Sequence, residues 1–427
     1  MNSSFQREPI GSGVYFNSVT DPKFKHNRLT ASLLLPLQRE TVSENALLPF
    51  LLRKGCRKLP DFTQLNRQLC TLYGASLSGD VGRFGAYQAL ELSIYGVDDR
   101  FTLDQARMVS DCAQLLADVL LDPHLPGGMF DPKEVELERQ QLCDTIESLI
   151  NDKRAYAVSR CREIMCEGEP LSIEKYGFLD KVKQITPQSA TQAWRRVLET
   201  AHVELFFVGS GNPESAKALF TQAFAKLQGR RPYAVEKQPL GAAAAKVREQ
   251  VDELDVAQSK LVMGFRTGPL ADDRAYAAMW LMTALFGGTP NSKLFLNVRE
   301  KLSLCYYCAA RFDRLTGLVL VDSGVEKQNR PKAQEEILRQ LEEIRAGNFT
   351  QEELTATLLQ VQNSLRSVSD SLGGLESWYM GQIMNQTHHT PAQEGELLAQ
   401  VTREELIQAA KQVQLDTVYF LTGKEAQ

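Results

Sequence analysis

Histidine is scarce in this sequence, with only five residues in a chain of 427. No two of them lie three or four positions apart, the spacing at which two side chains meet on one face of a helix. His388 and His389 are adjacent, so on a helix they would diverge by about 100° and could not share an ion in this manner. The others are His26, His124 and His202. The sequence therefore offers no helical histidine pair for a catalytic metal.

Long hydrophobic runs are also missing. No stretch of about 18 apolar residues occurs, so we expect no membrane-spanning helix. The first residues, Met1 to Glu8, lack the basic region and following apolar region of a signal peptide, and we therefore expect a cytoplasmic protein. The net charge is −5 and no long basic run appears, so nucleic acids and anionic membranes are not expected partners.

The eight cysteines do not indicate a disulfide framework. Most stand alone in apolar segments, where a thiol behaves as a small buried side chain. One Cys-x-x-Cys occurs, at Cys305 and Cys308, but no second pair accompanies it to complete a zinc site. We interpret these two as ordinary strand residues, and we expect neither a bound metal nor another cofactor.

The chain contains one pattern of elements twice. Gly55 matches Gly288 and Tyr73 matches Tyr306 at the same offset, and each half places an alternating strand before helices and two further strands. These strands are predicted at 27–37, 75–82, 86–97 and 203–208, and again at 259–266, 305–312 and 317–325. The repeat predicts two homologous domains, at residues 1–228 and 246–427, with a linker at 229–245.

Strands that follow one another directly, with helices clustered between them, are typical of an α+β fold. In the predicted strand 86–97, Leu90, Leu92 and Ile94 lie on one face and Glu91 and Ser93 on the other. We therefore predict, in each domain, a largely antiparallel sheet with helices packed on one side. Two such domains would face each other as a clamshell around a cleft.

The segment from Ser43 to Cys56 is predicted to be a buried helix. Ser43 can cap its start, apolar residues recur at helical spacing, and Gly55 can end it. Pro49 inside this helix removes one backbone hydrogen bond, which costs about 3 kcal/mol unless the helix bends.

With its neighbours, this helix resembles the zinc-site helix of the pitrilysin/insulinase metallopeptidases, whose signature is an inverted His-x-x-Glu-His motif. When the family's glycine is placed on Gly55, Ala46 and Phe50 stand at the positions of the two histidine ligands. Pro49 stands at the position of the catalytic glutamate. None of these side chains can bind zinc or deprotonate water. The resemblance therefore implies a zinc site that this chain has lost.

The family's third zinc ligand is a glutamate on a later helix, seven residues after the glutamate of a Glu-Arg pair. Glu138 and Arg139 form such a pair here, and Thr145 stands at the ligand position. Asp144 and Glu147 flank Thr145 but would point elsewhere on the helix. A Glu-Arg pair on an exposed helix face is ordinarily solvated, and we expect this one to be solvated as well.

The second half keeps what resembles the family's arginine-tyrosine motif, with Arg299 at a helix end and Tyr306 seven residues later on a strand. The resemblance implies that both side chains bind the peptide substrate, as donors to a peptide carbonyl. In an alternative that stays open, Arg299 pairs with Glu300 and Tyr306 is a core residue. Tyr307 replaces Tyr306 if the strand register is shifted by one residue.

Within the family, the chain is most similar to bacterial members that lack the zinc motif, including those named elongation factor P modification-associated proteins. The resemblance implies a catalytically inactive subunit that binds a peptide or unfolded protein. It would pair with a homologue that carries His-x-x-Glu-His, or with a second copy of itself. One alternative is a scaffold that holds a protein partner without proteolysis, and another is an autonomous zinc peptidase.

Overall fold

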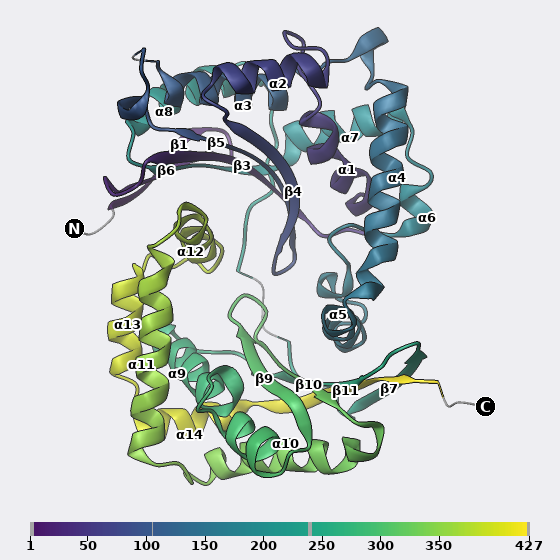
Figure 1. Cartoon of the computed structure of the whole chain (residues 1–427), viewed down its shortest axis with the longest axis vertical. Coiled ribbons are helices and arrows are strands. Elements are labelled where there is room, and N and C mark those ends of the chain that lie inside the picture. The colour runs from purple at the N-terminus through teal and green to yellow at the C-terminus, as the bar shows by residue number, and fades with distance from the viewer. Residues whose placement is uncertain (1–3, 105, 238–240, 425–427) are drawn as a thin grey trace. The chain divides into compact units, whose positions relative to one another are not determined.

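The computed structural model describes residues 4–104, 106–237 and 241–424. The chain divides into two compact units, each built from segments that are distant in the sequence (Figure 1). Unit 1 contains the described residues up to Glu147, Ile173–Glu236 and Asp370–Met384. Unit 2 contains Ser148–Ser172, the described residues between Lys237 and Ser369, and those from Asn385 onward. One segment of each half therefore belongs to the unit built mainly from the other half.

Unit 1 contains a six-stranded sheet with the order β1-β2-β6-β3-β5-β4. Strands β2 and β6 are parallel, and the other neighbouring strands are antiparallel, as the fold prediction requires. The strands are β1 Ser4–Gly11, β2 Val14–Thr20, β3 His26–Pro36, β4 Ser76–Phe84, β5 Tyr87–Val97 and β6 His202–Gly209.

One face of this sheet is apolar and the other is polar. Leu90, Leu92 and Ile94 of β5 are buried in the main core, so Glu91 and Ser93 lie on the opposite face, as their alternation predicts. Helix α3 lies over the apolar face, and α12 lies across the polar face (Figure 1). The helices of unit 1 are α1 Val42–Leu52, α2 Phe62–Thr71, α3 Met108–Leu121, α4 Pro132–Ser148, α6 Leu179–Val182, α7 Pro187–Thr200, α8 Pro213–Phe224 and α12 Leu372–Met384.

Unit 2 contains a five-stranded sheet with the order β7-β11-β8-β10-β9, in which β7 and β11 are parallel. Its strands are β7 Arg248–Leu254, β8 Ser259–Arg266, β9 Cys305–Asp313, β10 Leu318–Val325 and β11 Gln414–Gly423. Its helices are α5 Lys153–Met165, α9 Asp273–Thr283, α10 Arg330–Arg345, α11 Gln351–Val368, α13 Pro391–Ala399 and α14 Arg403–Gln412, with π-helical segments η5 Ala284–Gly288 and η6 Phe295–Lys301.

The two sheets share one topology. The spatial order β2-β6-β3-β5-β4 of unit 1 corresponds to β7-β11-β8-β10-β9 of unit 2, and β1 is an additional strand in unit 1. This shared order agrees with the internal repeat in the sequence. The boundaries between 1–228, 229–245 and 246–427 stay predictions.

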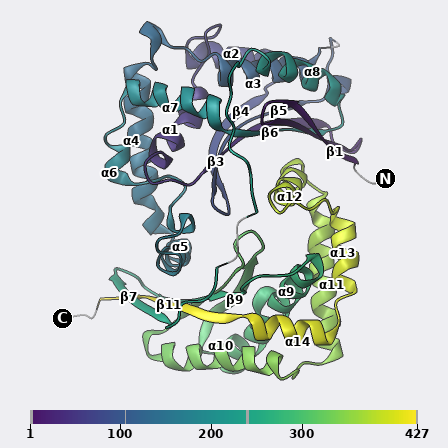
Figure 2. The same cartoon turned by 180° about the vertical axis from the view of Figure 1, so that it is seen from behind.

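Each sheet receives one helix from the other half of the chain, on the polar face in unit 1 and on one face of the sheet in unit 2. Helix α12 packs against β3 and β6 in unit 1, and α5 packs against β8 and β11 in unit 2 (Figures 1 and 2). Ala157 and Cys161 of α5 form a small apolar cluster with Val262, Tyr419 and Leu421. These two helices, here called the exchanged helices, are the reason that the units are discontinuous in sequence.

Most predicted elements are present, with some shifted ends. The strand predicted at 259–266 is observed with the same bounds, whereas the strand predicted at 75–82 is observed at Ser76–Phe84. The hairpin of β1 and β2 and the strands β7 and β11 were not predicted from the sequence. No helix in the described parts of the chain is both long and apolar enough to cross a bilayer.

Candidate functional site

Helix α1 places the residues of the lost zinc motif in and beside the core of unit 1. Ala46 and Pro49 are buried, and Phe50 is half-buried. Gly79 of β4 comes so close to the helix that a Cβ atom there would lie 2.4 Å from the carbonyl oxygen of Pro49. The helix thus packs tightly against the sheet, with side chains that carry no metal-binding atom at these three positions.

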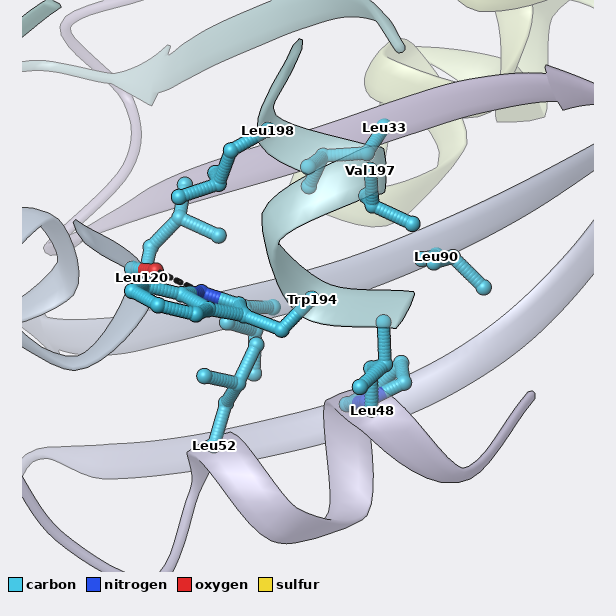
Figure 3. A pocket seen from close by; sticks show the side chains of 10 residues that line it. Leu33, Leu48, Leu52, Leu90, Leu120, Trp194, Val197 and Leu198 are labelled. Atoms are coloured by element: carbon cyan, nitrogen blue, oxygen red, sulfur yellow. Dashed lines mark hydrogen bonds between the residues drawn. The ribbon is translucent and has the colours of Figure 1, made fainter. Parts of the chain in front are cut away.

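A small apolar gap lies beside α1, as Figure 3 shows. Its volume is about 10 Å³, which is at most the room for one water molecule. The indole N–H of Trp194 donates to the carbonyl oxygen of Leu120 at 3.0 Å, so this polar group is already satisfied. The remaining lining residues are Leu33, Leu48, Pro49, Leu52, Leu90, Leu92, Val197 and Leu198. A gap with this size and lining belongs to the core and offers no ligand site.

The expectation that Glu138 is solvated is wrong. Only 1% of its surface is exposed. It shares the buried face of α4 with Val135 and Leu142, because the three residues recur at helical spacing. Its carboxylate lies 2.6 Å from the ammonium of Lys54 and 3.9 Å from the guanidinium of Arg53, just beyond the end of α1. A buried carboxylate requires a paired positive charge, and Lys54 supplies it.

Thr145 is engaged within its own helix, where its hydroxyl donates to the carbonyl oxygen of Gln141 at 2.8 Å. Two of the histidines pair with carboxylates: His202 with Glu204 at 2.7 Å, and His389 with Glu394 of α13 at 2.9 Å. Across the described residues, no three His, Cys, Asp or Glu side chains are grouped in a way that could hold a metal ion. The residues at the family's zinc position therefore do not fit a zinc ion, as the resemblance implies.

Arg299 and Tyr306 lie on consecutive elements of unit 2, in η6 and at the start of β9. The Arg299 guanidinium lies 4.5 Å from the centre of the Phe295 ring, and its Nε lies 3.4 Å from the carboxylate of Glu300. Tyr306 is 65% exposed, and its hydroxyl makes one long contact of 3.4 Å with Glu326. The pairing of Arg299 with Glu300 in the open alternative is thus present, but Tyr306 is not a core residue.

A β-bulge determines which tyrosine of β9 is exposed. β9 has one more residue than β10 between Cys305 and Tyr307, so Tyr306 is the extra residue in the ladder. The bulge shifts the alternation and brings Cys305 and Cys308 to one buried face. A hydrogen bond from the Cys308 thiol is the main cause that lowers the pKa of Cys305, and the same contact raises the pKa of Cys308.

Tyr307 points to the other face of the same sheet. Its ring centre lies 4.2 Å from the Arg154 guanidinium and 5.5 Å from the Lys260 ammonium. Arg154, from the exchanged helix α5, also pairs with Asp322 of β10. Burial is the main cause that raises the pKa of Tyr307. Tyr307 therefore belongs to a structured cationic environment rather than to the exposed position that Tyr306 occupies.

A group of charged residues on the polar face of the unit 1 sheet was not predicted from the sequence. Asp80 of β4 is directly opposite Glu91 of β5, and Glu376 of α12 is close enough to influence Glu91. Arg28 lies 2.5 Å from Glu376, and Thr30 donates to the same carboxylate at 3.0 Å. Burial, followed by Glu376 and Asp80, raises the pKa of Glu91 to about 7. Alternation placed Glu91 on the polar face, but no sequence signal connected it to Glu376.

Comparison with known proteins gives a consistent group of relatives. A family model described as the peptidase M16 inactive domain matches residues 184–361. The "Probable inactive metalloprotease YmfF" of Bacillus subtilis is 31% identical over 415 residues, covering 97% of this chain and 96% of that protein.

Solved structures of similar proteins extend over the whole chain. A conserved protein from Enterococcus faecalis is 26% identical, with a TM-score of 0.90 and full coverage of both chains. A peptidase M16 inactive domain from Pseudomonas fluorescens is 16% identical, with a TM-score of 0.78 and 99% coverage of each chain, which is a likeness of fold.

Proposed function

The chain belongs to the M16 peptidase family, and from this premise we propose that it is a peptidase-like subunit that binds peptide but holds no catalytic zinc. It pairs with a homologue that carries the His-x-x-Glu-His motif, and the bond is cut at the partner's zinc. The observation that carries the proposal is the environment of α1. The metal ligands and the catalytic base of the family are replaced by Ala46, Phe50 and Pro49. The buried Glu138 carboxylate forms an ion pair with Lys54.

Arg299 and Tyr306 are the proposed contribution of this chain to peptide binding. A guanidinium and a phenol are both hydrogen-bond donors suited to a peptide carbonyl. The exposure of Tyr306 supports this role, because among the described residues its hydroxyl has a single long contact, with Glu326, to exchange for a substrate. The contact between Arg299 and Glu300 is equally weak at 3.4 Å on the surface, so a substrate carbonyl can compete with it.

The test is coexpression with a homologous His-x-x-Glu-His protein, followed by size-exclusion chromatography and a peptide-cleavage assay. We expect a stable complex whose cleavage rate falls at least tenfold in the Arg299→Ala variant, the loss expected for a charge-assisted hydrogen bond. Tyr306→Phe removes a neutral hydrogen bond and should lower the rate less, by about twofold to tenfold. Arg366→Ala, on the exposed face of α11 in the same unit, is the matched control and should leave the rate unchanged.

Two outcomes would favour the other functions. A complex with no peptidase activity in either subunit would favour a scaffold that holds a protein partner. Stoichiometric zinc in the purified chain, measured by elemental analysis after incubation with zinc, would favour an autonomous peptidase. Unchanged cleavage in both the Arg299 and Tyr306 variants would remove these residues from the proposal.

A further inference from the structure

The polar face of the unit 1 sheet carries a continuous row of hydrogen-bond acceptors. Glu204 of β6, Ser32 of β3, Glu91 of β5 and Asp80 of β4 are direct neighbours in the strand register. Side chains of directly opposed residues lie on the same face of a sheet with Cβ atoms about 5 Å apart. Glu204 is fully buried and satisfied by Arg7, Asn17 and His202. The other three members of the row are less well matched.

Asp80 and Glu91 form a like-charge pair that the neighbouring cations do not neutralise. Like charges directly opposite each other on paired strands are destabilising. Arg28 is committed to Glu376 at 2.5 Å, and the ammonium of Lys175 donates to the carbonyl oxygen of Val81 at 2.5 Å. Asp80 accepts one local bond from the backbone N–H of the next residue. Within the described part of the chain, no hydrogen-bond donor contacts the Glu91 carboxylate.

Ser32 gives an independent indication that the polar groups at this point of the row are unmatched. Its exposed fraction is 0%, and its hydroxyl has no hydrogen-bond partner in residues 4–104, 106–237 and 241–424. A buried hydroxyl without a partner costs about 1–3 kcal/mol, so such groups are rare in folded proteins. Ser32 is directly opposite Glu91 and shares its face of the sheet, yet it bonds to neither adjacent carboxylate. The unmatched groups are therefore adjacent to one another.

We propose that Ser32, Glu91 and Asp80 form a binding site for the cationic side chain of a lysine or arginine in a peptide. The inference rests on the proposed function, in which this chain binds peptide. An ammonium offers three donors and a guanidinium five, which match one hydroxyl and two carboxylates in a row. A metal ion fits less well, because no group of three metal-binding side chains exists in the described residues.

The titration of Glu91 gives the site a characteristic pH dependence. The groups that face it are Asp80, Glu376, Arg28 and Lys175, and the net effect of burial and these charges raises its pKa to about 7. Below pH 7 the carboxyl is largely protonated and attracts a cation only weakly. Binding of a cationic side chain should therefore strengthen as the pH rises from 6 to 8 and should release protons near pH 7.

The test uses the full chain and four fluorescent peptides that differ only in one central residue. Each is an eight-residue glycine-serine peptide with blocked ends and a central lysine, arginine, norleucine or glutamate. Fluorescence anisotropy at pH 8 should give at least tenfold tighter binding for the lysine and arginine peptides. This preference should fall at pH 6. Glu91→Gln and Ser32→Ala should reduce it, whereas Glu404→Gln on α14 should leave it unchanged.

The outcomes separate the inference from the function on which it rests. Equal binding of all four peptides would overturn the cationic site and leave peptide binding intact. Failure of every peptide to bind would overturn both. Calcium alone binding with micromolar affinity, sensitive to Glu91→Gln, would replace the peptide site by a metal site. Thermal melting of each variant must show a folded protein, and a preference unchanged in folded Glu91→Gln would also overturn the inference.

Discussion

The sheets of unit 1 and unit 2 have the same strand order, but the faces that the exchanged helices cover carry different charges. In unit 1 this face presents Asp80 and Glu91, and the exchanged helix α12 adds Glu376. In unit 2 the face that α5 covers presents Lys260 and Asp322, and α5 adds Arg154. The apolar faces are constrained by close packing, whereas charges on a polar face can change without disturbing the core. The repeated fold therefore supports two chemically different surfaces.

The exchanged helices make the contrast clear, because their ion pairs are reversed in sign. In unit 1 an acid on the helix, Glu376, pairs with a base on the sheet, Arg28. In unit 2 a base on the helix, Arg154, pairs with an acid on the sheet, Asp322. The same structural task, attachment of the exchanged helix to the sheet, thus uses ion pairs of opposite orientation.

The largest expected effect concerns a buried ion pair in unit 1 and an exposed one in unit 2. Lys54→Met should destabilise the protein by about 3–5 kcal/mol, because it leaves the buried Glu138 carboxylate without its counter-ion. Arg274→Met, which breaks the more exposed pair with Glu405, should cost much less. Urea unfolding measures both. Equal losses of unfolding free energy in the two variants would contradict the distinction between buried and exposed pairs. Adding Glu138→Leu to Lys54→Met should recover most of the lost stability.

The reversed ion pairs of the exchanged helices predict separate local responses. Arg28→Met should raise amide hydrogen exchange in α12 by roughly tenfold, the effect of losing about one charged hydrogen bond, and leave α5 unchanged. Arg154→Met should have the reverse pattern. Mass spectrometry of peptides from α5 and α12 after hydrogen exchange measures both helices in one experiment. A rise in both helices for either variant would show that the two attachments are not independent.

The pH dependence of stability should differ between an acid of unit 1 and one of unit 2. The pKa of Glu91 is raised from 4.5 to about 7, so the folded state holds this proton more tightly than the unfolded chain. The stabilising contribution is complete below about pH 4.5 and is lost as the pH rises through about 7.

Glu91→Gln should therefore stabilise the protein at pH 8 by up to about 3 kcal/mol, with little gain at pH 5. Glu404→Gln in unit 2 is the control and should melt with the parent at both pH values. Thermal melts from pH 5 to 9 give the comparison. A gain for Glu91→Gln that is as large at pH 5 as at pH 8 would refute the assigned cause.

The smallest effect concerns thiol reactivity. Exposed Cys70 should react first with iodoacetamide at pH 8. Among the buried thiols, Cys305 of unit 2 should react before Cys112 of unit 1, because contact with Cys308 lowers the pKa of Cys305 while burial raises that of Cys112 to about 12. Peptide mass spectrometry after timed alkylation gives the order. The reverse order for Cys305 and Cys112 would show that access alone controls the reaction.

Periodicity predicted the fold well where one sheet face is apolar. The alternation of Leu90, Leu92 and Ile94 gave the correct face of β5, since one buried face determines the strand's register. It could not predict that α5 and α12 pack on the unit built mainly from the other half, because a helical pattern specifies an apolar stripe but not its partner. The burial of Glu138 was missed for a related reason: its partner Lys54 lies on a separate segment.

The candidate site was predictable only in part. The spacing predicted Tyr306 on a strand, but its exposure depends on the bulge beside Cys305. The sequence of β9 contains no glycine or turn signal that would predict this bulge. The row formed by Ser32, Glu91 and Asp80 depends on the pairing of three strands that are not all consecutive in the chain. Such cross-strand neighbours become visible only when the register is known.

Cleavage by the reconstituted pair is the most direct test of the central claim, that this chain assists catalysis without performing it. The zinc-bearing homologue should cleave peptide at least tenfold faster with this chain than alone, and replacing the homologue's His-x-x-Glu-His glutamate should abolish the activity of the pair. The Arg299→Ala variant of this chain should lose most of the enhancement. Equal cleavage by the homologue with and without this chain would contradict the account.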